Sequence, residues 1–297
     1  MAARDFLLLM LVCLLWASNA IVSKYAVSVL DAPPLFYAAV RFGIVLLVAF
    51  PFLFPVPRPL GRLLVAALMI GGGSFTLVFM GLKTATPSAT AIVGQISVPL
   101  TTLLSIFVLG ERMTARRVAG VAMTLAGALL VMWDPSGLRV SVGLIYIAAS
   151  AICASIGAVL MKQLDNVRPL QFQAWVGVVS APLLGLLSIL TEHDHIGHAT
   201  RGGWPLAAAV LYSALVVSVL AHSCYYILIR RYEANLVAPL TMMTPLATIV
   251  AGVALMGDPF GPRMMLGSAL AIVGVLVIVV RVNRLLPALQ TLFSGKN

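Results

Sequence analysis

The residues of this sequence that could do chemistry are polar side chains placed inside long apolar runs. Trp16 and Asn19 lie three residues apart, so on a helix they share one face. Gln95 offers two donors and an acceptor without a fixed charge. His222 and Tyr225 lie on a similar stripe, and histidine can change its charge near neutral pH. Such groups suit reversible binding of a small-molecule substrate, and His222 is a candidate for coupling that binding to protons.

Each of these side chains also has a purely structural interpretation. Asn19 and Gln95 could hydrogen-bond to a neighbouring helix, and His222 could be a neutral, hydrogen-bonded residue of the bundle. Arg41 lies about 9 Å below the end of its apolar run. It could snorkel, pair with an acceptor inside the membrane, or hold a substrate carboxylate. Thr244 is a weaker candidate for the same cavity. The sequence alone leaves these alternatives open.

No residue pattern indicates a catalytic centre, a metal site or a cofactor. The segment 192–195, with His198 close behind, contains three histidines and two acids but lacks the spacing of a zinc site. We interpret it as a solvated polar loop. The three cysteines are scattered through apolar runs, and no phosphate-binding loop is present. The sequence therefore predicts no enzyme, no metal and no cofactor.

The elements that position the polar side chains must be membrane helices. Of the 297 residues 61% are hydrophobic and 9% are charged, against about 45 to 50% and about 25% in soluble domains. A soluble fold is excluded by this composition. Backbone groups cannot face lipid unpaired, so continuous apolar runs of about 20 residues must be helical. The fold class is therefore all-α integral membrane, with room for about ten spans.

Ten apolar windows divide the chain into expected spans. They are residues 6–28, 35–54, 62–82, 87–109, 116–133, 143–162, 170–190, 205–229, 236–256 and 263–282. Of the 19 Lys and Arg residues, thirteen fall in loops on one side, four fall on the other, and Lys24 and Arg41 lie within or near spans. The positive-inside rule then puts both termini in the cytoplasm. We therefore interpret the net charge of +10 as a sign of membrane topology and not of nucleic-acid binding, because the cations lie in short loops.

The second half of the chain repeats the first. Each half carries a proline, then a glycine followed by an acid, then two glycines at gaps of ten and seven residues. These are Pro99, Gly110, Glu111, Gly120 and Gly127, and then Pro245, Gly257, Asp258, Gly267 and Gly274. Five spans per half mean that the halves enter the membrane in opposite directions. We expect a first repeat at 1–140, an inverted second repeat at 141–284 and a cytoplasmic tail at 285–297.

The repeated prolines and glycines predict two further features. Pro99 and Pro245 lie inside spans four and nine, where matched kinks beside a cavity would allow the halves to rock; ordinary tolerance of proline in membrane helices is the alternative. The glycines form small-residue stripes that allow close helix packing. They could also form a subunit contact in a homodimer.

Motifs along nearly the whole chain resemble those of one family. They are Trp16-Ala17-Ser18-Asn19, Pro33-Pro34 before Arg41-Phe42, Gln95 to Pro99 running to Gly110-Glu111-Arg112, and Arg231-Tyr232-Glu233 before Val237-Ala238-Pro239-Leu240. They resemble EamA-type proteins of the drug/metabolite transporter superfamily, and within it bacterial exporters of cysteine, O-acetylserine and related metabolites. The resemblance implies ten helices in two inverted repeats around a cavity lined by spans one, three, four, six, eight and nine. Asp258-Pro259 departs from the family, which usually repeats Glu and a basic residue there.

Together these observations predict a secondary transporter in the bacterial inner membrane. It would export small amino-acid-like metabolites by alternating access, with proton coupling as an additional hypothesis. An importer, or a carrier of another small solute, is an alternative of the same class. A lipid-modifying membrane enzyme is an alternative of a different class, and it would need clustered histidines and acids at one membrane interface.

Overall fold

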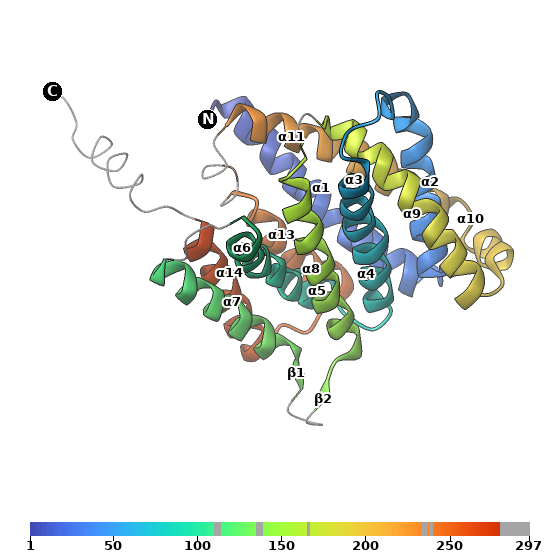
Figure 1. Ribbon diagram of the computed structural model, residues 1–297. Helices are drawn as coiled ribbons and strands as arrows, with labels where there is room; N and C mark the ends of the chain where they lie inside the picture. Colours follow the sequence, from blue (N-terminus) through green and yellow to red (C-terminus); the bar gives the residue numbers. More distant parts are fainter. Residues whose placement is uncertain (110–113, 135–138, 165–166, 233–236, 238–239, 280–297) are drawn as a thin grey trace.

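The computed structural model describes residues 1–109, 114–134, 139–164, 167–232, 237 and 240–279, and it is a bundle of helices (Figure 1). In this part of the chain nine helices are long and apolar enough to cross a membrane, and Met243–Met256 is a shorter apolar helix. Together they account for the ten expected spans. The all-α integral membrane fold predicted from composition is confirmed.

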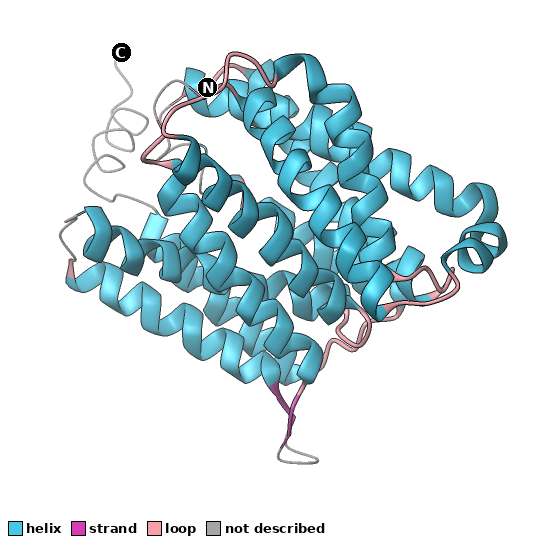
Figure 2. Ribbon diagram, turned by 45° about the vertical axis from the view of Figure 1, so that its right-hand side comes forward, coloured by secondary structure: helices cyan, strands magenta, loops and turns pink. Residues whose placement is uncertain are grey.

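The first half of the chain contributes five spans, joined to the second half by a short hairpin. The spans are α1 (Ala3–Ser28); α2 (Pro34–Ala49) with the 3-10 turn η1 (Phe50–Phe52); α3 (Leu60–Ala67), the π-helical segment η2 (Leu68–Gly73) and α4 (Ser74–Leu82); α5 (Pro87–Val93), the 3-10 turn η3 (Gly94–Ile96) and α6 (Ser97–Leu109); and α7 (Ala115–Met132). Strands β1 (Trp133–Asp134) and β2 (Arg139–Val140) pair antiparallel at one end of the bundle (Figure 2).

The second half repeats this arrangement. Its spans are α8 (Val142–Met161); α9 (Pro169–Thr191); α10 (His195–Leu211), the π-helical segment η4 (Tyr212–Ala221) and α11 (His222–Arg231); α13 (Met243–Met256); and α14 (Pro262–Val279). Residues 233–236 and 238–239, before α13, and the expected tail at 285–297 lie outside the described part of the chain. The repeat boundaries expected at 140 and 284 stay predictions.

Span eight begins earlier than the sequence predicts. The window 205–229 starts where the apolar run starts, but α10 is already helical at His195. The Asp194 side chain caps its first turn by accepting from the N–H of Gly197, and Gly203 breaks the helix with φ +52° just before Pro205. The extra turns carry polar residues at the membrane surface, so a search for apolar runs omits them.

Helix contacts between the halves follow a two-fold pattern. Helix α2 packs against α9, and α7 packs against α14, so equivalent spans meet directly. Helix α4, in the third span of the first half, packs against α8, the first span of the second half. In the same way η4, in the third span of the second half, packs against α1, the first span of the first half. Likewise α6 contacts α8 and α13 contacts α1. Exchanging the halves leaves this pattern unchanged, as expected for inverted repeats.

The small-residue stripes lie where α7 and α14 cross. A Cβ added to Gly120 would come within 2.7 Å of the Gly274 carbonyl oxygen, and one added to Gly127 would come within 2.6 Å of the Gly267 carbonyl oxygen. Real Cβ atoms do not approach backbone so closely, so glycine is required for this separation. The close helix packing predicted from the glycines is confirmed. Because the stripes are occupied within one chain, a homodimer would need another surface.

The bundle has two ends that differ in their contacts. At the N-terminal end, Arg231, the last residue of α11, donates to Asp5 of α1 at 3.0 Å. At the hairpin end, the Ser88 N–H donates to the Asp258 carboxylate at 2.8 Å. Each contact joins one half to the other, so both ends of the space between the halves are bridged in this structure.

Candidate functional site

Three of the predicted site residues form an aromatic cluster between α1 and α11. The Trp16 ring centroid lies 5.3 Å from that of His222 and 5.0 Å from that of Tyr225. The tilted and edge-on geometries are those that ring quadrupoles favour. Because α1 belongs to the first half and α11 to the second, this cluster lies between the two repeats.

The position of the His222 ring is fixed by the π-helical segment before it. Nδ1 lies 2.8 Å from the carbonyl oxygen of Val217, five residues earlier. A carbonyl oxygen can only accept, so Nδ1 carries a hydrogen and, in a neutral ring, Nε2 is left as an acceptor. Within the described part of the chain no residue hydrogen-bonds to Nε2. His222 therefore has one nitrogen held by the helix and one available for a proton or a solute.

Several buried polar atoms of the bundle have no hydrogen-bond partner among the described residues. On α1, α5 and α13, which contact one another, they are Trp16 Nε1, Asn19 Oδ1, Ser23 Oγ, Thr90 Oγ1 and Thr244 Oγ1. Thr244 lies against Cys13 of α1, whose thiol is at most a weak partner. Buried polar groups are almost always paired in proteins, so unpaired ones need an explanation. A solute that enters between α1, α5 and α13 would supply the missing partners.

Thr90 is a residue that sequence reasoning missed. It lies in α5, one turn before the 3-10 turn that carries Gln95. Threonine is common in membrane helices, where it usually bonds to its own backbone, so its residue type gave no signal. Thr76 and Thr102 do bond to the carbonyl oxygens four residues earlier. Thr90 shares with Thr244 the lack of such a bond among the described residues, and only the structure reveals it.

Gln95 and the two prolines lie at breaks in spans four and nine. Gln95 is in η3, which packs against α8 rather than beside the aromatic cluster. Pro99 is the third residue of α6, and Pro245 is the third residue of α13, so both helices start again just before a proline. Proline donates no backbone hydrogen bond, which leaves carbonyl oxygens at the break open to other partners. For Pro99 this is the carbonyl of Gln95, four residues earlier; close by, the Ser155 hydroxyl of α8 lies 2.9 Å from the Ser97 carbonyl oxygen.

The third span of each half contains a π-helical segment. Segment η2 covers Leu68–Gly73 and η4 covers Tyr212–Ala221. π-helical turns are rare and are often found at functional sites. Both belong to spans that the family resemblance places around the cavity, and η4 leads directly into His222.

Arg41 lies in the middle of α2 and does not snorkel. Its side chain is 2% exposed, and its Nε and Nη2 atoms donate to the Ser218 hydroxyl of η4 at 3.1 and 2.9 Å. Of the interpretations that the sequence left open, snorkelling does not describe this conformation. Pairing with an intramembrane acceptor does, and the third interpretation, a substrate carboxylate, is compatible with it.

The polar segment after α9 differs in part from the solvated loop that we expected. Glu192 is buried, and both its carboxylate oxygens accept backbone N–H groups at 2.9 Å, one from Leu35 and one from Phe36. The Ser188 hydroxyl donates to the same carboxylate at 2.8 Å. Glu192 thus satisfies the free N–H groups at the start of α2, and the expectation of a solvated loop was wrong for this residue.

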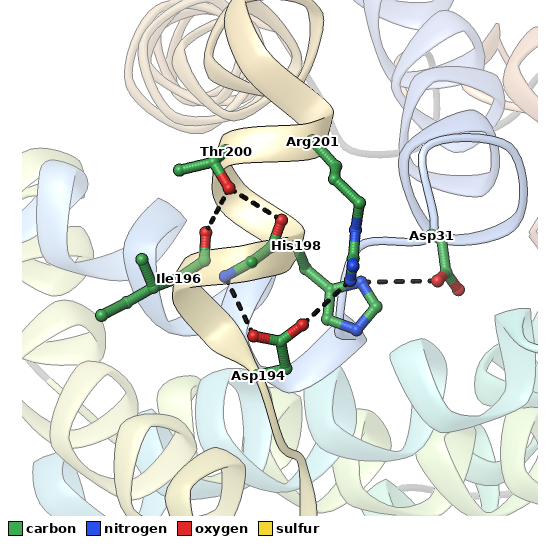
Figure 3. A network of polar contacts seen from close by, with 7 residues as sticks. Asp31, Asp194, Ile196, His198, Thr200 and Arg201 are labelled. Carbon is green, nitrogen blue, oxygen red and sulfur yellow. Dashed lines mark hydrogen bonds and ion pairs between the residues drawn. The ribbon is translucent and has the colours of Figure 1, made fainter.

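The remaining polar residues of that segment do lie near the surface (Figure 3). Arg201 pairs with Asp194 at 3.1 Å, and His198 lies 3.4 Å from the exposed Asp31. Figure 3 shows these side chains converging on the first turns of α10. In the part of the chain that the structure describes, no three His, Cys, Asp or Glu side chains are grouped to hold a metal ion.

Comparison with known proteins identifies a family and several relatives. Residues 4–133 and 141–280 both match the EamA-like transporter family. The chain is 31% identical to a "Probable amino-acid metabolite efflux pump" of Salmonella typhimurium and 27% identical to a protein of that description from Escherichia coli. Each of these alignments covers 93% of this chain and 95% of the relative.

Two further comparisons agree with this similarity. A "Probable terminal-alkyne amino-acid exporter" of Streptantibioticus cattleyicolor is 29% identical over 65% of this chain and 64% of its own length. A solved structure described only as "Crystal structure of protein" has a TM-score of 0.64 and 23% identity, covering 96% of this chain and 99% of the other. That structure shows that the fold is shared and carries no information on substrate.

Proposed function

The chain belongs to the EamA-like transporter family, and we propose that it exports small amino-acid-like metabolites across the bacterial inner membrane by alternating access. The family and the names of the relatives point to a membrane transporter rather than an enzyme. The names of the relatives from Salmonella typhimurium and Escherichia coli support amino-acid metabolites as its cargo and export as its direction.

The observation that carries the proposal is the set of unpartnered polar atoms between the halves. Trp16 Nε1 is a donor, Asn19 Oδ1 is an acceptor, and the Thr244 hydroxyl is both. A small solute with donors and acceptors of its own would satisfy all three. Neutral groups suit a carrier, because a site that binds too tightly would not release its solute.

The helix breaks in spans four and nine are the proposed hinge points of the transport cycle. In the proposed cycle, solute binds among Trp16, Asn19, His222, Tyr225 and Thr244, and Gln95, at the break in the fourth span, contacts it only after the halves have moved. The two halves then rock about the α2–α9 and α7–α14 interfaces. The breaks before Pro99 and Pro245 let spans four and nine bend at equivalent points, because each proline lacks the N–H that would bond to the preceding turn.

The distribution of charge supports an orientation. Exposed arginines at the N-terminal end include Arg58, between spans two and three, and Arg62, in the first turn of α3, while the hairpin end carries few cations. By the positive-inside rule the N-terminal end faces the cytoplasm, and an even number of spans returns the C-terminus to that side. The hairpin end then faces outward.

Export assays with single substitutions test the proposal. We expect cells that express the protein to tolerate and release selected members of a panel of amino acids, thiols and aromatic analogues. Gln95→Ala and Asn19→Ala should reduce that efflux by about tenfold, the effect of losing a hydrogen bond of 1.4 kcal/mol in the bound state. Ser28→Ala, exposed at the end of α1, is the matched control. No selective efflux of any compound by the wild type would reject export, and selective uptake in the same cells would favour an importer.

A further inference from the structure

Arg41 is a charged side chain in the middle of the bundle. It lies seven residues after Pro34, the first residue of α2, which places it about 10 Å along the helix axis. Its side chain is 2% exposed and is among the largest fully buried side chains of the protein. A cation at this depth in a membrane helix is costly and is therefore a functional hypothesis by default.

The guanidinium group has no anion beside it. Its Nε and Nη2 atoms both donate to one neutral oxygen, the Ser218 hydroxyl. Its central carbon lies 5.1 Å from the ring centroid of Phe75 and 5.9 Å from that of Phe42. Among the described residues no carboxylate pairs with it. The guanidinium has five N–H donors, and its partners among the described residues are one hydroxyl and two ring faces.

A second buried network holds this group in place. Tyr37, one turn before Arg41 on the same face of α2, donates to the Ala209 carbonyl at 3.0 Å, and its hydroxyl lies 2.6 Å from that of Ser213. Ser218 in turn donates to the Ser213 carbonyl at 3.0 Å, five residues earlier in η4. The π-helical turn and α2 are thus joined before any ligand arrives. A guanidinium fixed in this way loses little freedom on binding an anion.

Arg41 is connected to the aromatic cluster described above through η4. The Ser218 hydroxyl to which it donates lies four residues before His222, whose ring contacts that of Trp16. The unpartnered Trp16 Nε1 donor and the unpartnered Asn19 Oδ1 acceptor follow on the same face of α1. Arg41 and the Trp16 N–H thus supply donors, Asn19 Oδ1 supplies an acceptor, and Trp16 and Tyr225 supply aromatic ring faces.

We propose that Arg41 is the carboxylate-binding residue of the transport site, so that the exported solute is a small zwitterion with a free carboxylate and a free amine. This inference rests on the proposed function and narrows its substrate class. The guanidinium fork matches a carboxylate in shape and charge. The Trp16 N–H would donate to the same carboxylate. The amine would donate to Asn19 Oδ1 and lie against the faces of Trp16 and Tyr225.

Paired solutes that differ only in the carboxylate provide the test. Purified protein in liposomes would be assayed with L-cysteine against cysteamine and with L-phenylalanine against phenethylamine, the second of each pair lacking the carboxylate. We expect the wild type to transport at least one of the amino acids about tenfold faster than its amine. Arg41→Gln should remove this preference by lowering amino-acid transport while amine transport is unchanged. Arg62→Gln, at an exposed position, is the matched control for charge.

Folding and binding are measured on the same samples. The amino acid should raise the melting temperature of the wild type in detergent but not that of Arg41→Gln. If Arg41→Gln does not fold, Arg41→Lys and Ser218→Ala replace it, because both variants keep a cation at position 41. We expect the preference for the amino acid over its amine to fall by about threefold to tenfold. Arg41→Lys loses the planar fork of the guanidinium, and Ser218→Ala loses the hydroxyl that positions it.

The outcomes separate this inference from the function on which it rests. Transport of none of the solutes would reject the proposed function itself. Equal transport of acid and amine by the wild type would overturn the carboxylate role alone. So would an equal loss of both in Arg41→Gln, because that result indicates a structural residue.

Discussion

His222 is held by one ring nitrogen, and the other has no hydrogen-bond partner among the described residues. In the described part of the chain no Asp or Glu lies near the middle of a span, so His222 is the group best placed to exchange a proton there. Its Nδ1 contact with Val217 limits that exchange to Nε2. Proton coupling, if it operates through this residue, therefore operates through a single atom.

This geometry predicts the effect of His222→Gln on the pH dependence of export. A glutamine can keep a hydrogen bond to the Val217 carbonyl but cannot take up a proton. The export rate of the variant should therefore no longer change with pH between about pH 5.5 and pH 8. His195→Gln is a control of the same chemistry near the hairpin end, where the ring contacts Ser188. An unchanged profile in His222→Gln would remove this residue from the coupling mechanism.

Single residues show how far sequence reasoning reaches. The separate stripes of Trp16 with Asn19 and of His222 with Tyr225 could be proposed from residue type, because polar and titratable groups inside apolar runs are rare, but their meeting could not. The role of Glu192 could not, because its partners are backbone groups of α2 more than 150 positions away in the chain. Thr90 could not either, since it is distinguished only by a bond that it does not make.

At the scale of elements, the capping of α2 by Glu192 gives a stability prediction. Glu192→Gln leaves one side-chain oxygen in place of two, so the N–H of Leu35 or Phe36 loses its acceptor in a buried site. The expected cost is about 1 to 2 kcal/mol of unfolding free energy. The apparent melting temperature in detergent should fall by about 2 to 6 °C.

Asp194→Asn is the control for this substitution. Asp194 also caps a helix, but at an exposed position where water can replace it. Its replacement should change the melting temperature by less than that of Glu192. Equal melting temperatures for Glu192→Gln and the wild type would mean that the buried cap contributes little.

The sequence predicts which segments are membrane helices, but it does not predict where those helices depart from regular α-helical geometry. Apolar length and flanking charge locate each span, because the lipid imposes both. The π-helical segments η2 and η4 depend on packing against neighbouring helices: a Cβ added to Gly71 would clash with Ser180 of α9. The run Gly71-Gly72-Gly73 is compatible with such a segment but also with ordinary close packing. The restarts at Ser97 and Met243 were foreseen only as proline kinks.

At the scale of the whole molecule, inverted topology predicts which loops are accessible from outside. Cysteines placed at Val142 and Gly261, in a chain whose three native cysteines are replaced, should react with a membrane-impermeant maleimide applied to intact cells. Both positions are exposed at the hairpin end, and neither has a positive φ that would strain a side chain. A cysteine at Arg58, at the N-terminal end, should react only after permeabilisation. The reverse labelling pattern would overturn the orientation.

The hairpin of β1 and β2 has a consequence for the ancestry of this fold. It is the covalent link between two units of five crossings each, and the α2–α9 and α7–α14 interfaces join each unit to its counterpart. If the peptide were cut at the hairpin, the fragments would be two half-length subunits inserted with contrary polarity. The simplest precursor that this architecture admits is thus an antiparallel pair of separate subunits, later fused into one gene product.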